Sequence, residues 1–400
     1  MNIRKLLIVL CMLAFCGSGC SLLPQKPPTD QPKIVYADAD KYFSEFQDNL
    51  QYQHLNQTEQ HNYGLLYTTV KDAVQVDSNI EDGDVKYPGA TVRFDKPLTR
   101  ASMARLYESF LKDNPQLFFL DRTYSLEGHQ NEDEAVYDTL HLRFTLDRKE
   151  RKEATDRLDR AVESILINCP KTTDEYEIEK YLHDRLIAHC TYDELAASTG
   201  NDTHPNAYSA YGALVDGWAV CEGYSKAMQL LLNKMSISST VIMGCSADDA
   251  EAHMWNLVRI NDAYYYLDVT WDDTDDVPQY VYFNMTYEAM LRTHRPDNEQ
   301  FMDTTCTSVK DNFFVRNGTY CDIYDRQHIA KIIATHIQAG ESIVHLQFAP
   351  GKFENALLFL KNTQLTKKTI NNHLKQDVTM WDYTLHTQSK QNAITLIRIT

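Results

Sequence analysis

The spacing of apolar residues predicts helices and strands in three successive regions of the chain. In the first region, three segments repeat apolar residues every three or four positions, the period of a helix with one buried face. These segments are 55–74, 100–112 and 147–169. Asn56 and Glu59 form a pair typical of a helix start, and residues 136–146 alternate apolar and polar side chains as a half-buried strand does. We therefore predict an N-terminal α/β domain over residues 35–170.

The second region, residues 171–304, contains the patterns that carry chemistry. A helix is predicted over residues 176–194, and another begins near Cys221, after which apolar residues again recur at helical spacing. Two strand-like runs follow, residues 253–260 and 263–271. The third region, residues 305–400, mixes helical and strand patterns without a chemical motif, which predicts a small C-terminal α/β module.

The two strand-like runs are predicted to pair as a hairpin. Asn261 and Asp262 separate them, and both residue types tolerate the positive φ of a two-residue turn. In that register His253 and Asp268 project from the same face of the sheet, offset diagonally by two residues. An imidazole and a carboxylate at that offset are within reach of each other.

Cys221 stands at the head of its predicted helix. Unpaired backbone N–H groups and the positive end of the helix dipole favour a thiolate there. With His253 and Asp268, this gives the division of roles used in cysteine catalysis: the thiol attacks, the histidine removes its proton, and the carboxylate orients the imidazole. The N–H of Cys221 would hold part of an oxyanion, and no second donor is evident. Taken one at a time, residues of these types more often have a structural role.

Length and charge restrict the class of protein. Four hundred residues exceed what one core usually serves, so several domains are expected. The 56 acidic and 39 basic residues give a formal charge of −17, which repels the phosphates of nucleic acids. We therefore expect no nucleic acid partner.

The N-terminus has the pattern of a bacterial export signal over residues 1–19. A basic pair precedes an apolar run too short to span a membrane, and small residues follow. The sequence GSGC at 17–20 resembles the lipobox of bacterial lipoproteins, which implies a lipid on Cys20; simple secretion is the alternative. Residues 20–34 are rich in proline and form a tether. We expect an exported protein anchored by lipid to the outer face of the cytoplasmic membrane.

Six cysteines remain once the signal and Cys20 are set aside. A catalytic Cys221 must stay free, so these six cannot all pair with one another. Cys306 and Cys321 can form a disulfide or stay reduced, and the sequence leaves both open. No motif has metal-ligand spacing, so no metal or other cofactor is expected. The acidic cluster at 272–276 lacks the glycine and closing glutamate of a calcium loop, and we interpret it as a solvated turn.

Three blocks of the second region resemble the catalytic motifs of the bacterial transglutaminase-like superfamily. They are Cys-Glu-Gly-Tyr at 221–224, His-Met-Trp-Asn at 253–256 and Asp-Val-Thr-Trp at 268–271. The resemblance implies an α+β, papain-like core in which the nucleophile helix packs on an antiparallel sheet. It makes Cys221 the nucleophile, His253 the base and Asp268 the orienting acid. The segment DNPQLFFL at 113–120 is also similar to exported proteins of this type in Gram-positive bacteria.

Two classes of function fit these residues. An enzyme would pass an acyl group through a Cys221 thioester to water, as a peptidase or amidase, or to a lysine amine, as a protein cross-linker. Hydrolysis is favoured because nothing visibly excludes water, and the substrates would be cell-surface proteins or wall peptides. The alternative is a non-catalytic surface binding or scaffolding module that keeps the papain-like fold. Tyr224, Trp255 and Trp271 are candidates for lining a substrate cleft, with core packing as the competing interpretation.

Overall fold

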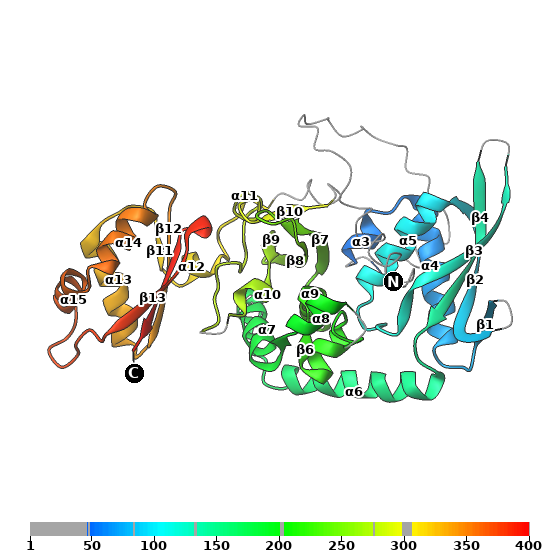
Figure 1. Cartoon of the computed structure of the whole chain (residues 1–400), viewed down its shortest axis with the longest axis horizontal. Coiled ribbons are helices and arrows are strands. Elements are labelled where there is room, and N and C mark those ends of the chain that lie inside the picture. Colours follow the sequence, from blue (N-terminus) through cyan, green and yellow to red (C-terminus); the bar gives the residue numbers. More distant parts are fainter. Residues whose placement is uncertain are drawn as a thin grey trace, which may run out of the picture.

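The computed structural model describes residue 46 and six ranges of the chain. These ranges are 49–82, 85–131, 134–200, 204–274, 277–297 and 306–399. They form three parts that lie in a row (Figure 1), each with a hydrophobic core of its own. The predicted export signal, Cys20 and the tether lie outside the described residues. Among the described helices, none is long and apolar enough to cross a membrane.

The N-terminal part is a four-stranded antiparallel sheet covered by helices. The sheet has the order β1-β2-β4-β3, with strands β1 (Asn79–Asp82), β2 (Val85–Thr99), β3 (Leu120–Gln130) and β4 (Ala135–Phe144). The helices are α3 (Leu50–Gln53), α4 (Gln57–Ala73) and α5 (Arg100–Asp113). The predicted capping pair is confirmed: the Asn56 side chain accepts from the N–H of Glu59, and the Glu59 carboxylate accepts from the N–H of Asn56.

Helix α6 (Arg148–Leu166) leads from the N-terminal part to the central part and runs beneath both in the view of Figure 1. An Asp147 capping box starts it, within the predicted helical segment. Its buried residues Leu158, Val162 and Ile165 pack in the core of the central part. Two buried polar contacts tie the parts together elsewhere: Gln51 Nε2 donates to Thr240 Oγ1 (2.8 Å), and Gln229 Nε2 donates to the carbonyl of Lys112 (2.8 Å).

The central part consists of helices packed on a four-stranded antiparallel sheet of order β10-β7-β8-β9. Its strands are β5 (Thr191–Tyr192), β6 (Trp218–Ala219), β7 (Ser239–Ser246), β8 (Ala252–Ile260), β9 (Ala263–Leu267) and β10 (His294–Pro296). Its helices are α7 (Glu175–His189), α8 (Glu194–Thr199), the π-helix η1 (Gly212–Asp216), α9 (Cys221–Lys234), α10 (Val269–Asp272) and α11 (Tyr287–Met290). Helix α9 packs against β7 and β8, which confirms the α+β core expected from the resemblance.

The β8–β9 hairpin has the predicted two-residue turn. Asn261 and Asp262 have φ values of 46° and 69°, and Ile260 pairs with Ala263. Positive φ at both central positions matches the right-handed twist of the flanking strands. The turn therefore sets the register that brings the far ends of the two strands together.

The predicted second strand of this hairpin is too long. The ladder ends where Asn256 pairs with Leu267, and the chain then turns into α10. Asp268 caps this short helix, because its Oδ1 accepts a hydrogen bond from the N–H of Trp271 (3.2 Å). The carboxylate is thus fixed at the strand end by local structure.

The C-terminal part is a four-stranded sheet of order β11-β12-β14-β13 with helices packed against it. Its strands are β11 (Tyr320–Cys321), β12 (Ile343–Phe348), β13 (Tyr383–Gln388) and β14 (Ala393–Arg398), and its helices are α12 (Phe313–Arg316), α13 (Arg326–Gln338), α14 (Phe353–Lys361), α15 (Thr363–Asn371) and the 3-10 turn η2 (Ser389–Gln391). Cys306 and Cys321 are both free and buried in different cores, Cys306 in the central one and Cys321 in the C-terminal one. Of the two alternatives that the sequence left open, the structure has the reduced form.

A buried carboxyl in the central part makes stability depend on pH. Glu179 on α7 is fully buried and accepts from Asn284 Nδ2 (2.7 Å), and burial raises its pKa from 4.5 to about 8. The folded chain keeps this proton to a higher pH than the unfolded chain. The contribution of Glu179 to the free energy of unfolding is therefore fully present below pH 4.5. It is lost as the pH rises toward 8, at about 1.4 kcal/mol per pKa unit.

Replacing Glu179 with glutamine is expected to flatten the loss of stability between pH 5 and pH 8, because the amide does not titrate. Urea unfolding at pH 5, 6.5 and 8 measures this loss for the parent and the variant. The buried Asp113, whose pKa burial raises to about 7, contributes a slope of the same sign in both chains. An identical pH slope in the two chains would show that Glu179 does not hold its proton in the folded state.

Candidate active site

Cys221 is the first residue of α9, as the sequence predicts. Val220 before it is extended, and no side chain caps the helix, so nothing in the cap competes for the first backbone N–H groups. The thiol is partly exposed. Cys221 therefore stands, partly exposed, at a helix end whose N–H groups and dipole can stabilise a negative charge on sulfur or on an oxyanion.

Gly223 allows the start of α9 to approach the preceding loop. A Cβ at this position would lie 2.4 Å from the carbonyl oxygen of Ala207 and 2.7 Å from the Cβ of Ala219. That same carbonyl accepts the N–H of Val220 (3.0 Å), which fixes the entry of the chain into the helix. The glycine in the Cys-Glu-Gly-Tyr block thus has a steric role in placing the nucleophile.

Replacing Gly223 with alanine is expected to lower stability by about 1–3 kcal/mol, because the added methyl group meets backbone that must move. Displacement of the helix start should also slow alkylation of Cys221. Urea unfolding and the rate of reaction with iodoacetamide measure the two effects. Lys234→Ala, an exposed position at the other end of the same helix, is the control. A variant with parent-like stability would contradict the tight packing of Gly223.

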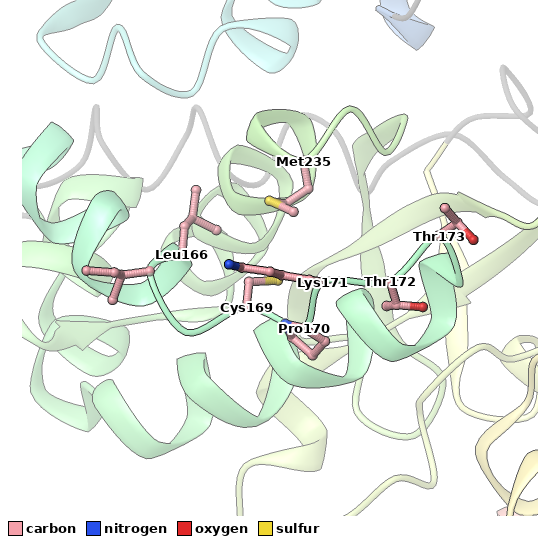
Figure 2. Close-up of a pocket in the computed structure, with 8 residues that line it drawn as sticks. Leu166, Cys169, Pro170, Lys171, Thr172, Thr173 and Met235 are labelled. Atoms are coloured by element: carbon pink, nitrogen blue, oxygen red, sulfur yellow. The ribbon is translucent and has the colours of Figure 1, made fainter.

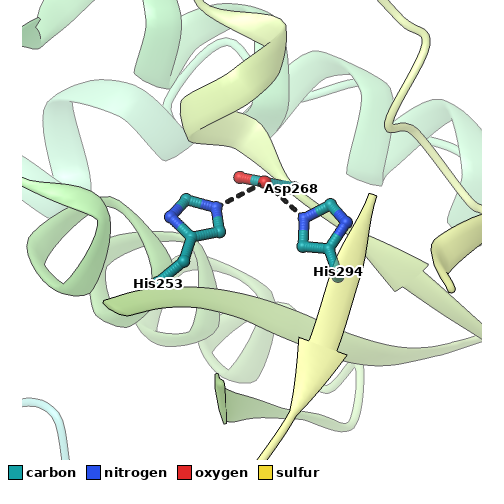
Figure 3. Close-up of side chains that lie close together, drawn as sticks. All are labelled: His253, Asp268 and His294. Carbon is teal, nitrogen blue, oxygen red and sulfur yellow. Dashed lines mark hydrogen bonds and ion pairs between the residues drawn. The ribbon is translucent and has the colours of Figure 1, made fainter. Parts of the chain in front are cut away.

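His253 and Asp268 point toward each other, as Figure 3 shows. Nε2 of His253 lies 2.7 Å from Oδ2 of Asp268, and the two residues are 9% and 1% exposed. The predicted histidine–carboxylate pair is therefore formed. Cys221 is among the groups that raise the pKa of His253, which puts its side chain close to the imidazole. Since Nε2 faces the carboxylate, Nδ1 is the nitrogen left to face the thiol.

The surroundings of His253 favour its protonated form. Burial alone would lower its pKa, but the charge and hydrogen bond of Asp268, together with those of Cys221, raise the pKa to about 10. Burial would likewise raise the pKa of Asp268, yet His253 and His294 hold that pKa well below its usual range. An imidazolium held by a carboxylate is the partner that a thiolate nucleophile needs.

His294 joins the site from β10 and is the residue that the sequence analysis missed. Its Nε2 lies 3.0 Å from the same Oδ2 of Asp268, and the residue is fully buried (Figure 3). It follows Asp268 by 26 positions, and β10 has only three residues, so periodicity gives no sign of it. The sign of His294 in the sequence is that a histidine follows the last of the three motif blocks by a short distance.

Asp268 and the two histidines are also the one group in the described part of the chain with the ligand types of a metal site. Their ligand atoms lie within 4.8 Å of one another. Both imidazoles, however, already contact the same carboxylate oxygen at hydrogen-bond distance. Hydrogen bonding accounts for the arrangement, and we assign no metal to it.

Two of the three aromatic cleft candidates are core residues. Tyr224 is fully buried and donates its hydroxyl to Asp273 (2.6 Å), and Trp255 is fully buried as well. The prediction that these two line a cleft is wrong, and the competing interpretation of core packing is right. Trp271 is partly exposed, and its ring stacks on His253 with centroids 4.7 Å apart and an interplanar angle of 22°. It therefore covers one face of the His253 imidazole.

The prediction of a solvated acidic turn at 272–276 is also wrong for its first residue. Asp272 is fully buried, accepts the N–H of Tyr282 (3.0 Å) and lies 3.3 Å from Nε2 of the buried His183. Burial raises the pKa of Asp272 to about 6, while the charges of Asp272 and Asp184 outweigh burial and raise that of His183 to about 9. These groups anchor α10 to α7 behind the site.

A surface depression of about 700 Å³ lies at the opposite end of α9 from the nucleophile. It is lined by residues 166, 167 and 169–173 together with Met235, which follows the last residue of the helix (Figure 2). A 14-residue helix is about 21 Å long, so this depression is remote from Cys221. It takes no part in the site.

A second pocket, of about 600 Å³, lies next to the nucleophile. Tyr192 and Trp218, from the paired strands β5 and β6, line it together with Leu195. Trp218 is 51% exposed and Leu195 is 50% exposed, so apolar surface is presented to solvent here. Ala207 also lines this pocket, and its carbonyl accepts the N–H of Val220 (3.0 Å). The pocket therefore adjoins the point where the chain enters the helix that begins at Cys221.

The fold and these contacts define a cysteine–histidine–aspartate site on an α+β core. Residues 167–269 match the family model of the transglutaminase-like superfamily, and this segment contains Cys221, His253 and Asp268. The chain thus carries a transglutaminase-like domain. No curated protein matches the chain in sequence.

Three solved structures are similar to parts of the chain. The structure of a TGase is 15% identical over 52% of this chain and 59% of its own, with a TM-score of 0.28. A candidate protease from Parabacteroides distasonis is 14% identical over 35% and 30% of the two chains, with a TM-score of 0.22. A candidate cysteine protease from Cytophaga hutchinsonii is 11% identical over 38% and 63%, with a TM-score of 0.23. The chain spans less than two thirds of the length of each of these structures.

Proposed function

We propose that the protein is an extracytoplasmic transglutaminase-like cysteine enzyme that transfers acyl groups through a thioester on Cys221. The observation that carries the proposal is the position of His253, whose Nε2 lies 2.7 Å from the Asp268 carboxylate and whose pKa is raised by Asp268 and by the nearby Cys221. These contacts orient a positively charged imidazole near the Cys221 sulfur at a helix N-terminus. A binding module needs none of this arrangement, and no other observation favours that alternative.

The proposed reaction has two steps. In the first, the thiolate of Cys221 attacks an amide carbon, the carbonyl electrons move to oxygen, and His253 gives its Nδ1 proton to the leaving nitrogen as the C–N bond breaks. In the second, neutral His253 takes a proton from water or an amine, which attacks the thioester and expels the thiolate. The backbone N–H of Cys221 stabilises the oxyanion in both steps. Asp268 keeps the imidazole in the tautomer and orientation that both steps require.

Water is the proposed acceptor, and cell-surface proteins or wall peptides are the proposed substrates. The pocket lined by Tyr192, Leu195 and Trp218 supports a side chain with an apolar stem as the group bound beside the sulfur. Location outside the cytoplasm, with a lipid on Cys20 as the anchor, rests on the sequence pattern alone.

A fluorescent alkylamine and β-casein test the proposal without knowledge of the natural substrate. The mature chain is expected to release ammonia or new peptide termini from casein, and Cys221→Ser is expected to release neither. If more amine is incorporated into casein than amide is hydrolysed, the acceptor is an amine and not water. If a panel of amide and peptide substrates gives no acyl-enzyme on Cys221 by mass spectrometry, acyl transfer is wrong.

A further inference from the structure

Two imidazoles meet on one oxygen of the orienting carboxylate. Oδ2 of Asp268 lies 2.7 Å from Nε2 of His253 and 3.0 Å from Nε2 of His294. Oδ1 accepts the N–H of Trp271. Because Asp268 is 1% exposed, these donors take the place of water around a buried charge.

The direction of each hydrogen bond follows from the charges. Asp268 is ionised, since its contacts with the histidines outweigh burial and keep its pKa low, so it only accepts. Nε2 of His294 must then donate to it. Burial lowers the pKa of His294, which leaves the ring neutral at pH 7 with a lone pair on Nδ1. The hydroxyl of Thr293, 2.9 Å from Nδ1, is positioned to donate to that lone pair.

The same chain of contacts reaches the C-terminal part. Oγ1 of Thr293 accepts from Nε2 of Gln391 (3.1 Å), which lies in η2 between β13 and β14. Nε2 of Gln391 also donates to the carbonyl of Ala289 (3.0 Å), and the residue is 1% exposed. A side chain of the C-terminal part is therefore built into the packing behind the catalytic residues.

We propose that His294 is a second positioning residue of the site, which fixes the rotation of Asp268 and thereby the ring of His253, and that Gln391 of the C-terminal part fixes His294 through Thr293. His294 is fully buried, so it acts through Asp268 and not on substrate. A carboxylate held by two imidazoles and a backbone N–H has one orientation. With one imidazole removed, Oδ2 can turn away from His253. This inference rests on the proposed function, because it assigns a role at the same site.

The test is the pH dependence of Cys221 alkylation by iodoacetamide in the mature chain, followed by mass spectrometry from pH 4.5 to 9. His294→Leu removes the donor, and His294→Gln keeps an N–H that can reach Oδ2. Thr293→Val and Thr293→Ser form a second pair with little change in volume, and Gln391→Leu breaks the contact to the C-terminal part. His336→Leu, on α13, is a histidine control.

His294→Leu is expected to slow alkylation about tenfold at pH 6 and to leave the rate at pH 9 unchanged, because an ordinary thiol is ionised there. His294→Gln should recover to within about threefold of the parent. Thr293→Val and Gln391→Leu should slow the reaction at pH 6 about two- to threefold, while Thr293→Ser and the control match the parent. A purely structural role would lower the rate equally at both pH values.

Three results would overturn the proposal. One is a His294→Leu profile that superimposes on that of the parent, and another is equal loss in the leucine and glutamine variants. If His294→Leu fails to fold, the proposal is tested by His294→Gln against the parent and by Thr293→Val against Thr293→Ser. The third is a parent whose Cys221 reacts like a free thiol and is unaffected by His253→Ala, in which case the proposed function fails as well. An activated, His253-dependent parent with a silent His294 refutes this inference alone.

Discussion

Replacing His253 with alanine is expected to slow the alkylation of Cys221 by iodoacetamide at pH 6 about 300-fold, because only about 1 in 300 ordinary thiols is ionised at that pH. In the proposed mechanism, a positively charged His253 beside the sulfur favours the thiolate at acidic pH. Without it, the helix N-terminus is the remaining stabilising feature, and its effect is small at a partly exposed site. The rate constants at pH 6, measured by mass spectrometry at Cys221, make the comparison.

Two controls separate a loss of the ion pair from a loss of fold. His336→Ala changes a histidine of the C-terminal part and should react at the parent rate. At pH 9 the His253→Ala variant should approach the parent, since the thiol ionises without help. Parent-like reactivity of His253→Ala at pH 6 would mean that the histidine does not activate the sulfur.

Replacing Asp268 with asparagine is expected to remove most of the positive charge on His253 at neutral pH. The carboxylate is the main reason that the pKa of His253 rises to about 10, so its loss should return that pKa toward or below 6.5 in a buried setting. The readout is the ratio of alkylation rates with anionic iodoacetate and neutral iodoacetamide, because an imidazolium attracts the anion. This ratio at pH 7 should fall about tenfold or more, and acyl transfer should fall about 10²–10⁴-fold.

Asp262→Asn in the exposed hairpin turn is the matched control, and its ratio should equal that of the parent. The same substitution removes the negative charge that faces His294. If Asp268→Asn keeps the parent ratio, the charge on His253 has another source, and the roles given to Asp268 and His294 would both need revision.

The parts of the fold and of the site that sequence could predict are those set by local structure. The Asn261–Asp262 turn, the helix head at Cys221 and the Asn56–Glu59 capping pair each depend on neighbours within a few residues. The turn fixed the register of β8 and β9, but Asp268 lies one residue beyond the ladder, so its contact with His253 also depends on the turn of the chain into α10. Local patterns of this kind are read reliably because few competing contacts act on them.

The parts that sequence reasoning missed depend on contacts between distant segments. His294 reaches Asp268 only because β10 adds to the edge of the sheet beside β7, a pairing that no local signal specifies. Asp272 lies in a run of acidic residues, which suggests a solvated turn. In the structure its buried carboxylate instead faces the buried His183 of α7. Aromatic residues occur in both clefts and cores, so the sequence does not decide between them for Tyr224. In the structure its ring is buried and its hydroxyl donates to the carboxylate of Asp273.

The most direct measurement of the central claim is the rate of Cys221 alkylation by iodoacetamide from pH 4.5 to 9 in the unmodified mature chain. An imidazolium beside a thiolate predicts a rate at pH 5.5 that stays within about tenfold of the rate at pH 8.5. An ordinary thiol instead loses about tenfold in rate for each pH unit below its pKa, or several hundredfold over this range. The shallow profile supports an activated Cys221–His253–Asp268 site, and the steep one contradicts it.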